Sequence, residues 1–112
     1  MTRIGRLLNA SVEVWRAELT DDGGGGQAET WSLVSAQRAR LSQPSARERT
    51  AADQAGARLT HVVYLPAAAD VRREDELRLG DGRVLDVLAV FEPSEPGTYL
   101  RADCHARQPT HQ

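Results

Sequence analysis

Apolar and polar side chains alternate along several short segments of the chain, and a period of two is the pattern of a strand with one buried face. Across residues 11–19 the apolar positions change face at Trp15, which a β-bulge at that point would explain. A second strand is expected over residues 30–40. The glycine-rich run 20–27 between them predicts a hairpin with a long, flexible tip.

The rest of the chain adds further short segments of the same kind. A Gly80-Asp81-Gly82 tip predicts a tight hairpin, and Pro93 with Pro96-Gly97 predicts another turn. Further strands are expected at residues 58–65, 76–79, 83–91 and 98–107. The sequence therefore predicts an all-β fold, a small antiparallel β-barrel of about six strands, because closure of the sheet removes exposed strand edges.

One segment, residues 42–56, breaks this pattern. Ser45 is followed three residues later by Glu48, which is the signature of a helix capping box. Several alanines favour a helix, and Gly56 is a plausible stop. The segment has no large apolar side chain to dock it. We expect a long polar loop or a short helix after the second strand.

Length and composition point to one domain made in a reducing compartment. The 112 residues form a single expected domain, 1–112, with a flexible N-terminal segment 1–10 and a frayed tail 108–112. A single cysteine, Cys104, excludes an internal disulfide, and the N-terminal residues lack the apolar core of a signal peptide. No apolar run reaches the roughly 20 residues that span a bilayer.

Candidate chemistry is sparse, and we expect neither catalysis nor a metal or other cofactor. The glycines at 23–26 lack the following Lys and helix of a phosphate-binding loop. His61, Cys104 and His105 come nearest to a cluster. Neighbouring residues of one strand point to opposite faces, so Cys104 and His105 cannot share an ion. Cys104 is expected to pack in the core.

A nucleic-acid module is the alternative interpretation, since small barrels often bind single strands. Such a site needs a basic groove and stacking aromatic rings. The formal net charge is −2, and the only close basic pairs near the polar segment are Arg38 with Arg40 and Arg47 with Arg49. The scattered aromatic residues are expected to fill the core or an interface: Trp15, Trp31 and Phe91.

The charged composition leaves two explanations open. The chain has fourteen arginines and no lysine. Arginine forks suit bidentate carboxylate contacts at subunit interfaces, whereas GC-rich coding would give the same bias without a function.

Short runs spread over nearly the whole chain share their order and spacing with one known family. They are Ile4-Gly5-Arg6-Leu7, Val12-Glu13-Val14-Trp15-Arg16, Asp22-Gly23-Gly24-Gly25, Glu29-Thr30-Trp31, Ser45-x-Arg47-Glu48-Arg49, Thr60-His61-Val62-Val63, residues 75–85 and Tyr99-Leu100-Arg101-Ala102-Asp103-Cys104. In these runs the chain resembles the phage head–tail joining, or head-completion, family of connector and stopper proteins.

The resemblance implies a structural neck protein of a phage or gene-transfer particle. Members are small β-barrels that form a ring, here expected to be a dodecamer, beneath the portal or adaptor of a filled capsid. The ring extends the DNA channel and docks tail or tail-terminator proteins. Implied partners are therefore further copies of the chain, the portal or adaptor, tail proteins and, non-specifically, packaged DNA, with no membrane. Assembly would occur in the bacterial host cytoplasm.

The resemblance also suggests site residues. In some members the polar loop after the second strand projects into the channel and closes it, and residues 42–56 correspond to that loop. We expect inter-subunit ion pairs there, or else a disordered loop that packs between subunits. The candidate gating residues are Arg47, Glu48, Arg49, Asp53 and Gln54. In the N-terminal segment, Ile4, Arg6 and Leu7 are expected to contact the adaptor or a neighbouring subunit.

Overall fold

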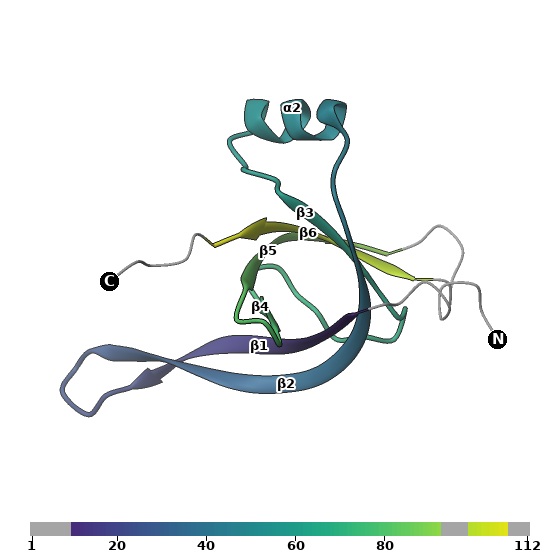
Figure 1. The fold of residues 1–112 in the computed structure, drawn as a ribbon. Helices are drawn as coiled ribbons and strands as arrows, with labels where there is room; N and C mark the ends of the chain where they lie inside the picture. Colours follow the sequence, from purple (N-terminus) through teal and green to yellow (C-terminus); the bar gives the residue numbers. More distant parts are fainter. Residues whose placement is uncertain (1–9, 93–98, 108–112) are drawn as a thin grey trace.

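The computed structural model describes residues 10–92 and 99–107, and the six strands in these ranges close into one antiparallel barrel (Figure 1). Hydrogen-bonded neighbours follow the order β1-β2-β3-β6-β5-β4, and β4 returns to β1. The predicted all-β barrel is confirmed. The elements are β1 (Ala10–Asp21), β2 (Gln27–Ser42), the helix α2 (Ala46–Gln54), β3 (His61–Leu65), β4 (Glu76–Leu79), β5 (Val84–Phe91) and β6 (Leu100–Ala106).

Strands β1 and β2 form one long hairpin whose tip extends away from the barrel (Figure 1). The register shifts between Val14 and Trp15, which confirms an irregularity near Trp15. The extra residue, Val34, lies in β2, so Trp15 stays on the face opposite Val14. Both strands are longer than predicted, and the tip is correspondingly shorter, spanning residues 22–26. There Asp22 N donates to Gly26 O at 3.2 Å, and the Asp22 carboxylate accepts from the Gly24 amide at 2.8 Å. Cross-strand pairing thus extends the ladder into polar sequence that has little strand propensity of its own.

The barrel interior is filled by aliphatic side chains from all six strands. They are fully buried, or nearly so, at Val12, Val14, Ala39, Val63, Leu65, Leu77, Leu85, Val87, Leu100, Ala102 and Cys104. The core position predicted for Cys104 is confirmed. The three aromatic residues for which the core was one possibility lie elsewhere: Phe91 is 51% exposed, and Trp15 and Trp31 lie half-buried on the outer face.

The remaining predicted boundaries differ slightly. Strand β3 begins at His61 rather than at residue 58, although Leu59 is buried just before it. The β4–β5 hairpin has the expected glycine turn, in which Gly82 adopts a φ of 95°, a value that side-chain-bearing residues rarely take. The predicted turn at 93–98, the N-terminal segment and the tail 108–112 lie outside the described residues, except that Ala10 begins β1.

An ion pair stabilises the closure of the barrel beside the point where β1 pairs with β4. The Asp75 side chain is buried and accepts from Arg16 Nε at 3.0 Å and Arg16 Nη2 at 2.9 Å. It also accepts from the Arg72 amide at 2.8 Å, so both carboxylate oxygens are satisfied. Asp70 holds the outer side of the same guanidinium. Barrel closure is therefore secured by charge as well as by the β ladder.

Candidate functional site

The polar segment after β2 forms the short helix α2, and its ends follow directly from the sequence. Ser45 Oγ accepts from the Glu48 amide at 3.1 Å, and the Glu48 carboxylate accepts from the Ser45 amide at 3.0 Å. This reciprocal pair is the predicted capping box. Beyond the helix, Gly56 has a φ of 82°, and the Ala57 amide donates to Ala52 O at 2.8 Å, which ends the helix.

Helix α2 has little packing against the barrel. None of its residues is buried, and in Figure 1 it stands apart from the strands, at the end of the two segments that connect it to β2 and β3. The nearest anchor on the β2 side is Pro44, which is buried just before the N-cap. The prediction of a polar excursion without an apolar docking face is therefore confirmed.

Within the described residues, the ion pair between Arg101 and Glu48 connects the helix to the barrel wall. Arg101 of β6 donates to the Glu48 carboxylate through Nη2 and to Asp103 through Nε at 2.8 Å. The Ser45 amide and the Arg101 guanidinium lower the pKa of Glu48 to about 2, so this carboxylate is charged at neutral pH. Glu48 therefore acts within its own chain, as cap and as tether.

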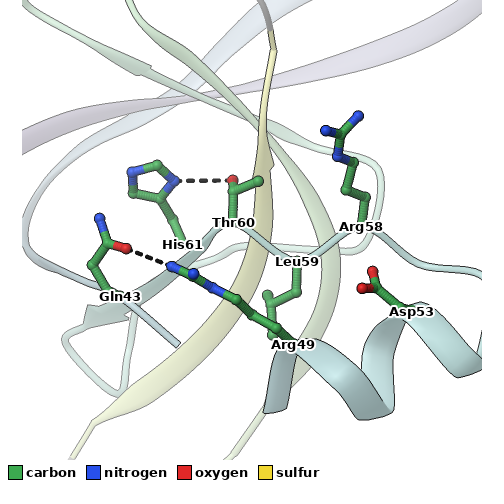
Figure 2. A pocket seen from close by; sticks show the side chains of 7 residues that line it. All are labelled: Gln43, Arg49, Asp53, Arg58, Leu59, Thr60 and His61. Carbon is green, nitrogen blue, oxygen red and sulfur yellow. Dashed lines mark hydrogen bonds between the residues drawn. The ribbon is translucent and has the colours of Figure 1, made fainter. Parts of the chain in front are cut away.

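Beneath α2 the chain forms a shallow pocket of about 400 Å³ (Figure 2). Two of its side chains, Arg49 and Gln43, point toward one another, and Arg49 Nη2 donates to Gln43 Oε1 at 2.6 Å. In the same pocket, Thr60 Oγ1 lies 3.0 Å from His61 Nδ1. The pocket is lined by Gln43, Arg49, Asp53, Arg58, Leu59, Thr60 and His61.

The charge of this pocket comes from arginine rather than histidine. Burial, followed by the nearby positive charges of Arg83 and Arg49, lowers the pKa of His61, so the imidazole is neutral at pH 7. Arg49 and Arg58 remain charged, and Asp53 supplies one opposing carboxylate. Two guanidinium groups in an open pocket suit phosphate or carboxylate oxygens.

The candidate gating residues divide into three groups in the structure. Arg49 and Asp53 line the pocket, whereas Glu48 faces Arg101. Arg47 and Gln54 are exposed on the helix. Whether any of these side chains meets another subunit stays a prediction. The candidates Ile4, Arg6 and Leu7 lie outside the described residues.

Sequence reasoning missed Arg101, Arg58 and His61 as parts of this region. Arg101 lies on the outer face of β6, far from Glu48 in the sequence, and no local pattern marks it as the tether. The sequence marks His61 only as a candidate metal ligand. Among the described residues no group of three or more His, Cys, Asp or Glu gathers in a way that could hold a metal ion. Across residues 10–92 and 99–107, no helix has the length and apolar character needed to cross a membrane.

A closed six-strand barrel with one capped helical excursion defines the chain as a small β-barrel module. The sequence model of the phage head completion protein family matches residues 4–107, and the chain belongs to this family. The solved structure of protein SF1141 from Shigella flexneri 2a matches with a TM-score of 0.70 and 23% identity, over 92% of this chain and 95% of that one. This likeness shows the shared fold. No curated protein matches the sequence significantly.

Proposed function

We propose that this protein is a structural component of a phage or phage-like neck. In this proposal it assembles as a ring beneath the portal or adaptor, extends and closes the DNA exit channel, and docks the tail. Membership of the head completion family supports a role in head completion, and it implies contact with other head or tail components. The finer steps are argued from the arrangement of α2.

The observation that carries the gating proposal is the combination of a capped α2 with no buried residue. A helix with no buried residue, held by the Glu48–Arg101 ion pair and the Arg49–Gln43 hydrogen bond, can move as a unit when these polar contacts break, because little apolar surface has to be exposed. In a ring, copies of α2 would converge, and exposed Arg47 could pair with Asp53 of a neighbour. Such pairs are individually weak, so many copies would be needed to hold the gate closed.

The pocket beneath α2 supports the proposed contact with packaged DNA. Arg49 and Arg58 would bind phosphate oxygens without reading sequence. The same two arginines favour the alternative function, a nucleic-acid-binding module. The overall charge of −2 argues for weak affinity toward free DNA, so the two functions differ in measured salt dependence. A nucleic-acid module would bind free DNA with affinity that falls steeply as salt rises.

The decisive experiment removes the gene from its parent element and examines particle morphology and DNA content. Heads that package DNA, lose it and never acquire tails are the expected result. Normal tailed particles would reject the neck assignment and bring forward the nucleic-acid module.

The gating step is tested separately with Arg47→Ala combined with Asp53→Ala. We expect increased DNA leakage from tailless heads, since both partners of the proposed inter-subunit pair are removed. The matched control is Arg83→Ala, which removes a half-exposed arginine from the β4–β5 turn. DNA retention equal to that of the control would overturn the gate while leaving the neck role intact.

The N-terminal segment is proposed to contact the adaptor or a neighbouring subunit through Ile4, Arg6 and Leu7. Deleting residues 1–9 leaves β1 whole, since that strand begins at Ala10. Assembly into heads should fail while the cooperative melt of the barrel is preserved. A lost melt would instead show that the segment is part of the core.

A further inference from the structure

The outward side of the β1–β2 hairpin carries a partly exposed apolar surface. After the bulge, Trp15 is opposite Leu33, and Ala17 is opposite Trp31, so these side chains share one face of the two-stranded ribbon. Leu19 continues that face and is 66% exposed, while Leu33 is 52% exposed. We call this surface the hairpin stripe; it consists of Trp15, Ala17, Leu19, Trp31 and Leu33.

The base of the hairpin stripe is held in place by polar contacts. The Arg78 guanidinium lies over the Trp15 ring at 4.1 Å and 6.0 Å from the Trp31 ring centre. Each indole N–H donates to a glutamate two residues earlier, at 3.0 Å for Glu13 and 2.9 Å for Glu29. The stripe is thus preorganised, and a partner that covers it would order few side chains on binding.

A second exposed surface lies on the outside of the barrel, across strands β2, β3, β6 and β5. Arg40, Tyr64, Arg101 and Phe91 are successive cross-strand partners on β2, β3, β6 and β5, so they form one outward-facing row. Tyr99 packs edge-on against Tyr64, with ring centres 5.3 Å apart. Phe91 is 51% and Tyr99 38% exposed. We call these five residues the aromatic platform.

The two surfaces belong to segments of opposite net charge, with Arg78 over the base of the stripe and with Glu48 and Asp103 paired to Arg101 of the second surface. The hairpin between residues 17 and 33 contains four carboxylates and no basic residue. The part of the chain beside the aromatic platform, residues 38–49, contains four arginines and one carboxylate. Two hairpins meeting face to face would bring like charges together, whereas a hairpin on a platform brings opposite charges together.

From this complementarity we propose that the hairpin stripe of one copy docks on the aromatic platform of the next copy. The hairpin tip and the ends of β5 and β6 that carry the platform lie at opposite ends of the molecule (Figure 1). The contact is therefore head-to-tail, which is the interface type that generates rings or open filaments rather than two-fold dimers. This inference rests on the proposed ring and names the surfaces that would close it.

Paired cysteines test the contact in heads that carry the protein. In a chain with both Leu19→Cys and Phe91→Cys, oxidation should give a ladder of oligomers beyond the dimer. Each single variant should give no ladder, because neither surface meets itself. The native Cys104 is fully buried and does not interfere. The matched control combines Ala28→Cys with Phe91→Cys, since Ala28 is exposed on the opposite face of the same hairpin.

An equal ladder from the Ala28→Cys control, no ladder from the test pair, or dimers from Leu19→Cys alone would each overturn the proposal. A second measurement uses Arg40→Glu, which should keep the melting temperature but reduce incorporation into heads by at least about tenfold. Unchanged incorporation also counts against the contact. A ladder together with normal tailed particles after gene deletion would keep the interface and reject the neck function; the reverse pair of results would do the opposite.

Discussion

Replacing Ser45 by Ala should loosen α2 without weakening the barrel. The substitution removes the side-chain oxygen that accepts from the Glu48 amide at 3.1 Å. Loss of such an N-cap costs about 1 kcal/mol. Because no residue of α2 is buried, we expect this cost to appear as local opening of the helix rather than as loss of global stability.

The magnitude can be read from amide hydrogen exchange followed by NMR. A cost of about 1 kcal/mol raises the population of the open helix roughly fivefold. The amides of Ala55, Gly56 and Ala57, which bond to carbonyls within or at the end of the helix, should exchange faster by that factor. The Val87 amide, bonded to Asp75 O at 2.9 Å in the barrel, should keep its rate, and the melting temperature should not change.

A matched substitution on the same helix has the opposite sign. Thr50 is exposed and its hydroxyl donates to Ala46 O, so Thr50→Ala exchanges a weak helix former for the best one. Exchange of the α2 amides should become slower. The reasoning would be refuted if Ser45→Ala lowered barrel protection as much as helix protection, since α2 would then unfold only with the whole domain.

Three further predictions concern charge and burial. Arg16→Met leaves the buried Asp75 carboxylate without its main partner and should lower the free energy of unfolding in urea by about 2–3 kcal/mol. The control Arg72→Met, at a side chain 67% exposed, should lower it by less than about 1 kcal/mol, and equal losses would contradict the prediction. Burial raises the pKa of the Cys104 thiol well above its usual range, so native protein at pH 8 should not react with a thiol reagent until denaturant is added; rapid native reaction would contradict the placement. The pKa of Glu48 is lowered to about 2 in the folded protein, so its stabilisation of the helix is complete above the unfolded pKa of about 4.3 and is lost as pH falls toward 2. An NMR titration of the carboxylate with a midpoint near 4 would contradict this.

Local chemistry made much of the fold predictable. The capping box at Ser45 depends on Glu48, three residues away, and the β4–β5 turn depends on Gly82; both were confirmed. The alternation of apolar residues also identified β6 and its buried Cys104. Such features can be read from sequence because the interactions that stabilise them are local.

Long-range pairing accounts for what could not be predicted. Alternation shows which residues share a face, but it does not show that Trp15 and Trp31 face outward under Arg78. The Glu48 tether depends on Arg101, which is brought close only when β3 pairs with β6. The candidate site could therefore be located on residues 42–56, while the residues that position it came from the tertiary fold.

The closure of the barrel through β1 and β4 has a consequence for how the chain reaches its native state. Partners such as Val12 and Leu79 come from distant parts of the sequence, so their pairing carries a large loop-closure entropy. The β4–β5 hairpin has a short turn and can form on the microsecond scale, whereas the long-range pairing of β1 with β4 is expected to form more slowly. A newly made chain would therefore expose two open strand edges for milliseconds to seconds. During that interval the Arg16–Asp75 ion pair would not yet be formed, and the carboxylates of the β1–β2 hairpin would oppose pairing between neighbouring unfinished chains at those edges.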